Sequence, residues 1–421
     1  MEVIKGTKIH DGIFIGTVFM FDEYEHELYE MSKTQPLIMV ANNFSPLETM
    51  LFRHHNVCAL VSTLATSTSH TAILSATMDW PAVSKITIKK EWHGQMAIID
   101  GNSGLFIVNP DLETEKAYFI KYEMEKMEKD KILNEYINQR AVTKSGKSIK
   151  IYSNISVPYD AIKSKMNGAE GIGNFKTEFM YLESNDYPTE DELFKIYSEV
   201  VSNSPKYKVV IRTFDIGNDK VAPYFMLDKE ENPALGYRAI RIGLDRPELQ
   251  KTQMRAILRA SALGNVSIMY PMVVSVDEIL KLKQMLNQVM DELKQEDIPF
   301  NQNIEQGIMI ETPAAVIISD ELAKNVDFFS IGTNDLIQYT LATDRQNYKL
   351  SKIYNPYHTA ITRSIAYVVR NAHKAGIWVE ISGELGSDLT KISEFINMGI
   401  DALAVSPAKI PRLRKAICEM E

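Results

Sequence analysis

Eight short apolar runs in the last two-thirds of the chain constrain its fold more than any other feature. Each run is long enough for one β-strand, and most are separated from the next by a stretch of helical length. Strand and helix alternating eight times is typical of a (β/α)8 barrel, so we expect an α/β fold with such a barrel in this region. The runs span residues 149–155, 169–175, 209–214, 267–273, 304–310, 326–331, 378–381 and 402–406.

Charged and polar residues stand at or just past the ends of most of these runs. In a barrel of parallel strands the carboxyl ends of the strands meet at one face, and that face carries the active site. The pattern therefore predicts a single active-site face. The residues concerned are Asn154, Lys176, Arg212, Asp215, Glu311, Asn334, Asp335, Ser382 and Glu384.

Composition excludes several classes of protein. With 421 residues, 45% of them hydrophobic and 24% charged, the chain has the makeup of a globular protein of more than one domain. No apolar run approaches a membrane span and no secretory leader is present, so we expect a cytoplasmic protein without membrane contact. The net charge of -9 argues against a nucleic-acid partner. Two cysteines, Cys58 and Cys418, are too few for a disulfide framework or a cysteine zinc site.

The first 110 residues differ from the rest and predict a compact β-rich domain. Their short apolar runs span residues 12–21, 36–40, 57–62, 96–99 and 105–108, with turn residues between them. Residues 112–140 are dense in Glu and Lys spaced three or four apart, which favours a solvated linker helix. A partner-binding coiled coil is the alternative, and it requires a sustained apolar heptad. The domains we expect are 1–110, a linker at 111–143 and the barrel at 144–421.

Two carboxylates at neighbouring strand ends suggest a metal site. Glu311 follows the run GIMI and Asp335 follows FFSIGTN, so both should face the same mouth of the barrel. Hard oxygen ligands with open positions suit Mg2+ or Mn2+, which bind one or two carboxylates together with substrate oxygens. A structural salt bridge is an equally good interpretation of the pair taken alone.

Basic residues near this pair indicate an anionic ligand. Arginine forks match phosphate and carboxylate geometry with two parallel hydrogen bonds. Each arginine by itself is more simply interpreted as a surface residue, but four basic groups around a metal pair would define a site for a small phosphate-bearing anion. The four are Lys176, Arg212, Arg238 and Arg345.

The first domain offers one reactive candidate, His70 in LATSTSHTAIL. Hydroxyl groups of Thr68, Ser69 and Thr71, with free amides at the start of a following helix, are suited to hold a phosphate beside the imidazole. A neutral histidine nitrogen is a good nucleophile near pH 7, so it can accept a phosphoryl group. A helix-capping or packed histidine is the simpler alternative.

These residues lie in motifs that closely resemble enzyme I of the phosphoenolpyruvate:sugar phosphotransferase system, and less closely pyruvate phosphate dikinase and phosphoenolpyruvate synthase. The resemblance covers nearly the whole chain. Its motifs are TSHTAIL (68–74), GIGNFKTEFMYL (171–182), IRTFDIGNDK (211–220), ENPALGYRAIR (231–241), GIMIETPAA (307–315), GTNDLIQYTLATDR (332–345) and SGELG (382–386).

The resemblance implies a swivelling phosphohistidine domain, a hinge at the linker helix and a barrel that binds phosphoenolpyruvate and forms a homodimer. Within it, His70 matches the histidine that takes the phosphoryl group, and Glu311 and Asp335 match the Mg2+ ligands. The residues that match groups on the substrate phosphate and carboxylate are Lys176, Arg212, Arg238, Asn334 and Arg345.

Four departures from the family pattern concern the acceptor and the chemistry. Only about fifty residues separate Phe21 from His70, so the helical insert that docks the phosphocarrier protein is absent. Ala65-Thr66-Ser67 replaces a glycine pair and an arginine, and Asn43 replaces an aspartate. Ser382 stands where a cysteine protonates enolpyruvate, and a hydroxyl is a much poorer acid than a thiol. Lys176 replaces an arginine and loses its fork.

We therefore expect an enzyme that phosphorylates its own His70 from phosphoenolpyruvate, with pyruvate or enolpyruvate released, and passes the group to an unidentified acceptor. Without the docking insert, that acceptor is a small molecule or an unusual partner protein. The alternative is a catalytically impaired paralogue that binds phosphoenolpyruvate as a sensor or regulator. An ATP-linked synthase or dikinase would need a separate nucleotide-binding subunit, because the chain has no glycine-rich phosphate loop.

Overall fold

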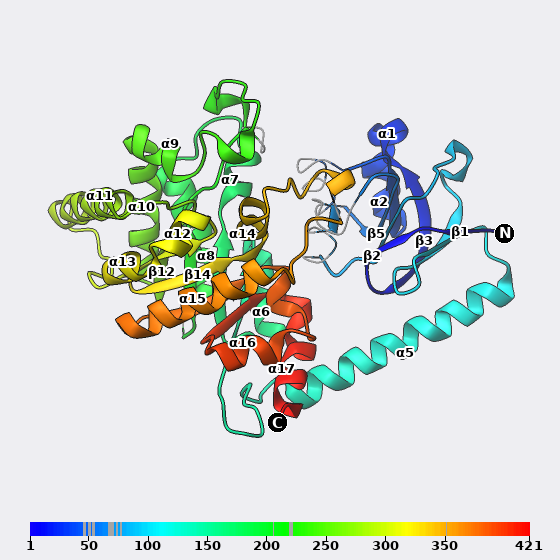
Figure 1. Ribbon diagram of the computed structural model, residues 1–421. Coiled ribbons are helices and arrows are strands. Elements are labelled where there is room, and N and C mark those ends of the chain that lie inside the picture. The colour runs from blue at the N-terminus through cyan, green and yellow to red at the C-terminus, as the bar shows by residue number, and fades with distance from the viewer. Residues whose placement is uncertain are drawn as a thin grey trace. The chain divides into compact units, whose positions relative to one another are not determined.

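The computed structural model of the chain contains two compact units (Figure 1). It describes residues 1–44, 48, 52, 55–65, 71–72, 75, 78–204, 206–218, 222–350 and 352–421. The first unit comprises Met1–Asn134 together with Asp344–Tyr354, and the second comprises Glu135–Thr343 together with Asn355–Glu421. Each unit is described by itself.

The first unit is built on an eight-stranded mixed sheet, in the order β1-β8-β7-β3-β4-β5-β6-β2. Three short helical segments follow β3 directly: α1 (Phe21–Tyr24), η1 (Glu25–Glu27) and α2 (Leu28–Thr34). The strands are β1 (Glu2–Lys5), β2 (Thr7–His10), β3 (Ile13–Met20), β4 (Leu37–Ala41), β5 (Val57–Ser62), β6 (Ala82–Ser84), β7 (Met96–Asp100) and β8 (Leu105–Val108).

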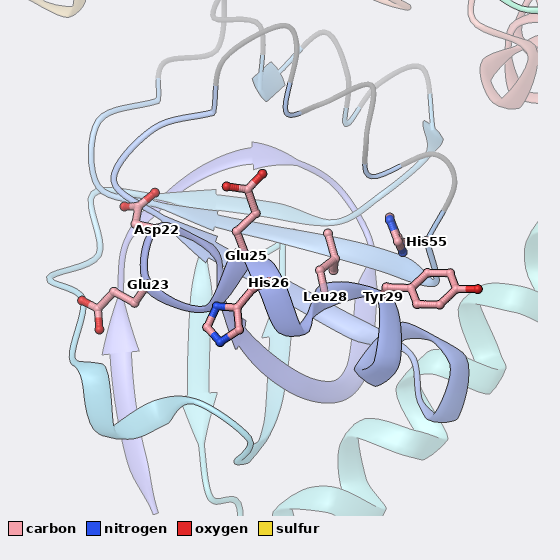
Figure 2. A pocket seen from close by; sticks show the side chains of 7 residues that line it. All are labelled: Asp22, Glu23, Glu25, His26, Leu28, Tyr29 and His55. Atoms are coloured by element: carbon pink, nitrogen blue, oxygen red, sulfur yellow. The ribbon is translucent and has the colours of Figure 1, made fainter.

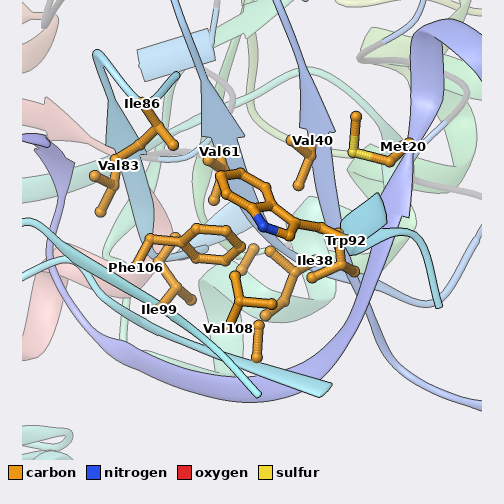
Figure 3. Packing of buried hydrophobic residues seen from close by; sticks show 13 residues of the cluster. Met20, Ile38, Val40, Val61, Val83, Ile86, Trp92, Ile99, Phe106 and Val108 are labelled. Carbon is orange, nitrogen blue, oxygen red and sulfur yellow. The ribbon is translucent and has the colours of Figure 1, made fainter. Parts of the chain in front are cut away.

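Both faces of this sheet are buried, which explains why its central strands are apolar without alternation. Val18 of β3 belongs to a core cluster around Trp92 and Phe106, which Figure 3 shows. Phe19, the next residue, faces the opposite way, into a second cluster that includes Leu37. Side chains on a strand point alternately to its two faces, so one strand supplies both cores.

Helix α5 (Leu112–Tyr136) follows the sheet and packs against it. Its Tyr118 lies in a buried cluster with three isoleucines of the sheet, namely Ile13, Ile98 and Ile107. An ion pair of 2.8 Å between Lys129 Nζ and Asp79 Oδ2 adds a polar contact along the same helix. The Glu- and Lys-rich stretch therefore folds as one helix, which ends at Tyr136 rather than at residue 140.

The second unit is a closed barrel of eight parallel strands, so the expected α/β fold class is confirmed. Strand β16 pairs with β9 and closes the cylinder, with Ala402 opposite Lys150. The strands are β9 (Lys150–Ile155), β10 (Gly171–Lys176), β11 (Lys208–Arg212), β12 (Val266–Tyr270), β13 (Glu305–Ile310), β14 (Phe328–Gly332), β15 (Trp378–Ser382) and β16 (Ala402–Val405).

Helices surround the barrel and connect its strands (Figure 1). Among the described residues, no helix is long and apolar enough to span a membrane. The helices of this unit are α6 (Pro158–Met166), α7 (Glu178–Leu182), α8 (Glu190–Asn203), α9 (Ile240–Asp245), α10 (Pro247–Ser261), α11 (Val276–Gln295), α12 (Pro313–Ile317), α13 (Ser319–Leu322), α14 (Thr333–Thr340), α15 (Thr359–Ala375), α16 (Ile392–Met398) and α17 (Ile410–Glu419).

Two barrel strands end earlier than the apolar runs suggest, and both endings have a local cause. Strand β12 stops at Tyr270 because Pro271 has no amide hydrogen for the ladder, and Met272 then takes a left-handed φ of 59°. Strand β11 stops at Arg212, since the amide of Phe214 donates to the Gln253 side chain instead of to a strand. These early endings turn the chain just where the charged residues begin.

Candidate active site

Sequence-predicted polar residues lie at the carboxyl ends of the barrel strands. Lys176 and Arg212 are the last residues of β10 and β11, and Ser382 is the last residue of β15. Glu311 directly follows β13, and Asp335 lies in the first turn of α14, directly after β14. Because all eight strands are parallel, these residues share one end of the barrel.

Arg212 is the buried centre of the site. Its side chain is 5% exposed and its Nη2 donates to Glu178 Oε1 and lies 3.6 Å from Asp215 Oδ2. Nε of Arg212 is buried and has no hydrogen-bond partner among the described residues. Desolvation opposes the charged guanidinium, but Glu178 and Asp215 outweigh it and hold the pKa of Arg212 above its usual value. The interpretation of Arg212 as a surface residue is thus wrong.

Arg238 lies against the same carboxylate. Its Nε and Nη2 both donate to Asp215 Oδ1, at 3.0 and 2.7 Å, and its side chain is 2% exposed. The next residue, Ala239, has a φ of 54° and a ψ of -130°, a region that residues with a Cβ rarely adopt. The fold therefore accepts backbone strain beside Arg238, and strain of this kind is commonest at functional sites. Arg238 is a second buried arginine, also not a surface residue.

Glu311 is a buried carboxylate with one oxygen available to a ligand. Oε1 accepts a hydrogen bond of 2.7 Å from the amide of Met272, whose left-handed backbone directs it there. Oε2 is buried and has no hydrogen-bond partner among the described residues. Burial, Asp335 and Asp215 raise the pKa of Glu311 to about 8, against the pull of Arg212. A carboxyl group that is costly to ionise, next to other carboxylates, is the environment that a bound cation relieves.

The donor set suits a divalent metal held by few protein ligands. Among the described residues, no three His, Cys, Asp or Glu side chains gather closely enough to hold a metal ion by themselves. Glu311 and Asp335 interact electrostatically, so two carboxylates are available. Mg2+ is commonly bound in this way, through one or two carboxylates with substrate phosphates and water filling the other positions.

Lys176, Asn334 and Glu384 form a second group at the mouth. Desolvation would raise the pKa of Glu384, but the charge of Lys176 and a hydrogen bond from Asn334 hold it below its usual value. Gly383 has a φ of 122°, and a Cβ added there would stand 2.6 Å from Thr333 Oγ1. The glycine thus lets β15 turn closely past α14 and brings Glu384 to Asn334.

Ser382 is enclosed by two asparagine side chains. Its Oγ donates to Asn154 Oδ1 and accepts from Asn174 Nδ2, both at 3.3 Å, and the residue is 4% exposed. Asn154 is fixed in turn by donating to the carbonyl of Ala404 at 2.8 Å. Asn174 and Glu178 shape the site although they were not among the predicted residues, whereas Asp215 was among the strand-end residues of the predicted active-site face. Asn174 and Glu178 lie inside quoted motifs, so their buried polar character was the available signal.

Two predicted residues are not among those described at the barrel mouth. His70 and residues 66–69 lie outside the described residues, and the neighbouring Thr71 is buried. Arg345 lies on Asp344–Tyr354, the segment that belongs to the first unit. The site described at the barrel mouth is therefore built without either residue.

The first unit has an open hollow of about 590 Å³ on its short helices (Figure 2). Negative charge dominates its lining, so it is a poor site for phosphate. None of the predicted site residues lines it. The lining residues are Asp22, Glu23, Glu25, His26, Leu28, Tyr29 and His55.

Comparison with known proteins identifies the family of both units. Residues 131–421 match the PEP-binding domain of PEP-utilising enzymes, and residues 33–104 match the mobile domain of the same enzymes. PEP is phosphoenolpyruvate. The first match covers more than half of the chain.

Curated relatives agree over nearly the whole chain, and each bears the name phosphoenolpyruvate-protein phosphotransferase. The protein from Priestia megaterium is 40% identical over 392 residues, which are 92% of this chain and 68% of that protein. The Buchnera aphidicola (subsp. Schizaphis graminum) protein is 42% identical over 90% of this chain and 67% of its own length. The Bacillus subtilis (strain 168) protein is 39% identical over 92% and 68%. The chain belongs to the family of PEP-utilising enzymes and is an enzyme of PEP-dependent phosphotransfer.

Proposed function

We propose that the protein transfers the phosphoryl group of phosphoenolpyruvate to its own His70 and passes it on to an acceptor. The observation that carries the proposal is the buried cluster at the barrel mouth, in which Arg212 and Arg238 surround Asp215 while Glu311 keeps one oxygen without a partner. A buried arginine whose Nε has no partner among the described residues, as in Arg212, suits a dianionic phosphate or a carboxylate.

The basic groups bind and orient the substrate. Arg212 offers its buried Nε, and Arg238 is held rigid by two bonds to Asp215. Lys176 and Asn334, which meet at Glu384, add a charge and an amide for the phosphate or carboxylate. Arg345 joins them as a further substrate-binding group. Fixed donors would hold the substrate so that its phosphorus faces the incoming imidazole. Phosphoryl transfer is catalysed mainly by such positioning and by stabilisation of charge.

Glu311 and Asp335 are proposed to hold a divalent cation, Mg2+ or Mn2+. The partnerless Oε2 of Glu311 and the charge of Asp335 fit such an ion. When bound, the cation supplies positive charge to the phosphate oxygens. Without it, the two carboxylates would repel an anionic substrate, so both side chains require the ion if they are to serve the reaction.

Ser382 is proposed to deliver a proton to C3 of enolpyruvate after the phosphoryl group has left. Its hydroxyl lies at the barrel mouth between Asn154 and Asn174, which fix its direction. Because a hydroxyl is a weak acid, this step depends on what can replace the proton on Ser382.

The wider arrangement follows from the same proposal. Residues 1–110 form the swivelling phosphohistidine domain, residues 111–143 the linker and residues 144–421 the barrel. We also propose that barrels pair into a homodimer, which sedimentation velocity would test. The acceptor is a small molecule or a protein that does not need the helical docking insert, since only 16 residues, 21–36, connect β3 to β4.

The test is to incubate the purified protein with Mg2+ and phosphoenolpyruvate labelled on phosphorus. We expect acid-labile label on the wild type and none on His70→Ala. Asn43→Ala, close to the same loop in sequence, is the matched control and should keep most of the label. A wild type that binds phosphoenolpyruvate without becoming labelled would replace the proposal with the sensor alternative, which no observation favours at present.

A further inference from the structure

A buried acid lies next to Ser382 in the lumen of the barrel. Along β15, alternate side chains point to the same face, so Trp378, Glu380 and Ser382 all face the lumen. Trp378 stacks on Phe328 with ring centroids 4.5 Å apart, at the amino-terminal end of the barrel strands. Ser382 lies at the carboxyl-terminal end, where it bonds Asn154. Glu380 lies between Trp378 and Ser382 and is fully buried. No step of the proposed reaction uses it so far.

The carboxyl group of Glu380 has one satisfied and one unsatisfied oxygen. Oε1 accepts a hydrogen bond of 2.7 Å from Ser330 on β14. Oε2 is buried without a hydrogen-bond partner among the described residues. It occupies the space that a side chain on Gly173 would need, since a Cβ there would stand 2.5 Å from it. The glycine therefore makes room for this acid.

Strand β10 connects the acid to the hydroxyl. Its pairing with β9 shifts between Ile172 and Asn174, and this irregularity turns both Gly173 and Asn174 to the lumen. Gly173 borders Glu380 Oε2, and Asn174 donates to Ser382 Oγ at 3.3 Å. Asn174 Oδ1 is buried without a partner as well. Two partnerless oxygens and a hydroxyl thus lie around the same two residues, and such a set suits one bridging water.

We propose that Glu380 is the proton reservoir for Ser382, a role that rests on the proposed function. As C3 of the enolate takes the Ser382 hydroxyl proton and the enolate oxygen becomes the ketone of pyruvate, the Glu380 carboxyl proton passes through one water to Ser382 Oγ. Glu380 is left as a carboxylate and regains its proton from solvent. Glu380 acts through Ser382 and does not touch the substrate. It is therefore a positioning residue, whose part is to return a proton to Ser382.

Burial keeps Glu380 protonated at neutral pH against the pull of its neighbours. Burial raises its pKa to about 8, while the Ser330 hydrogen bond and the charge of Lys208 on β11 work in the opposite direction. Lys208 is paired with Glu305 on β13, so little of its charge is left for Glu380. The other titratable group that faces the acid is Tyr152 on β9. Gly173 and Ala404, from the strands on either side of β9, contribute no charge.

Solvent exchange at C3 of pyruvate tests the relay directly. In D2O with Mg2+, proton NMR follows the loss of the pyruvate methyl signal, which requires the same proton transfers in reverse. We expect Glu380→Gln to slow this exchange roughly a hundredfold, while labelling of the protein by phosphoenolpyruvate in a single turnover changes by less than about threefold. Glutamine keeps the size and hydrogen bonding of the side chain, so a merely structural role would leave the exchange rate intact.

Glu394→Gln is the matched control, because it makes the same change at a carboxylate of helix α16 that pairs with Lys391, and it should leave both rates unaltered. A second variant covers the case in which Glu380→Gln does not fold. The wild-type exchange rate should rise with pH to a plateau above about 8, and Ser330→Ala should move this rise to higher pH by removing a bond that lowers the pKa of Glu380.

The outcomes separate the two proposals. Suppose that the wild type takes label. If Glu380→Gln then exchanges the methyl hydrogens normally, or loses labelling and exchange to the same extent, the reservoir proposal is wrong and the proposed function stands. An unchanged pH profile in Ser330→Ala leads to the same conclusion. Wild-type protein that takes no label and exchanges no methyl hydrogen overturns the proposed function, and the reservoir with it.

Discussion

At the scale of single residues, the contact between Arg238 and Asp215 offers a sharp test of the proposed function. Two nitrogens of Arg238 bind one oxygen of Asp215, so a lysine at this position would replace this two-nitrogen contact by a contact from one nitrogen. We expect Arg238→Lys to lower kcat/KM for labelling by phosphoenolpyruvate about a hundredfold, which is about 2.7 kcal/mol of transition-state binding. Quench-flow measurement of labelled protein gives the rate.

Arg241→Lys is the control for this change. Arg241 lies three residues on and, within the part of the chain that the structure describes, donates only to the backbone carbonyls of Leu235 and Gly236, at 2.9 and 2.7 Å. It should label at close to the wild-type rate. Equal losses in both variants would mean that the 233–241 segment acts as a whole and that the Asp215 pair has no special part.

Glu380 also makes stability depend on pH. Its pKa rises from 4.5 to about 8 on folding, so between these values the folded state holds more protons than the unfolded state. The free energy of unfolding therefore falls as pH rises, by about 1.4 kcal/mol per pH unit from this group. Relative to wild type, Glu380→Gln should gain stability from about pH 5 to 8 and then level off. Urea unfolding at several pH values measures the difference, and a constant difference would contradict the burial argument.

At the scale of elements, helix α5 depends on a small apolar contact. Tyr118 is 8% exposed and packs on Ile13, Ile98 and Ile107, whereas the neighbouring Phe119 is 56% exposed. We expect Tyr118→Ala to destabilise the first unit by about 3 kcal/mol and to speed hydrogen exchange along the helix. Phe119→Ala removes a side chain of similar size from the solvent face and should do neither. Equal effects would show that α5 is held by its charges instead.

The barrel strands could be predicted from sequence because each is a short apolar run that is buried on both faces. The strands β1, β2 and β6 were not predicted, and their residues explain why. Glu2–Lys5 and Thr7–His10 are half-exposed strands at the sheet edges with few apolar residues, and Ala82–Ser84 has only three. Such strands are defined by their partners rather than by their own composition.

The gathering of polar residues at one end of the barrel was predictable for a similar reason, because parallel strands all end on the same side. The sequence could not show which polar side chains form hydrogen bonds or ion pairs with one another. The glutamate of the motif TEF, Glu178, bonds Arg212, and Asp215 is shared by two arginines. In the sequence, Glu380 is a single charged residue within an apolar run. Its burial beside Gly173 becomes visible in the closed barrel. Side-chain partners that are distant in sequence depend on how the strands are paired around the barrel, as Ser330 on β14 and Glu380 on β15 show.

At the scale of the whole molecule, the two units should divide the reaction. We expect a fragment beginning at Glu135 to bind phosphoenolpyruvate with Mg2+ within about tenfold of the full chain and to take no label, because the barrel carries its own core and binding cluster. Isothermal titration calorimetry measures the affinity, with full-length His70→Ala as the control. The fragment keeps Arg345, so a fragment with a native circular dichroism spectrum that does not bind would assign part of the substrate site to residues 1–134.

The pairing of β16 with β9 also has a consequence for synthesis on the ribosome. Ala402 lies opposite Lys150, so about 250 further residues must be synthesised after β9 begins before its pairing partner β16 leaves the ribosome. Residues 1–110 are complete long before that and can fold first. Until β16 arrives, β9 and β15 are both exposed edges, and open edges invite pairing with other chains. A chain that ends at residues 383–401, after β15 but before β16, should therefore aggregate, even though almost every proposed site residue has already been made.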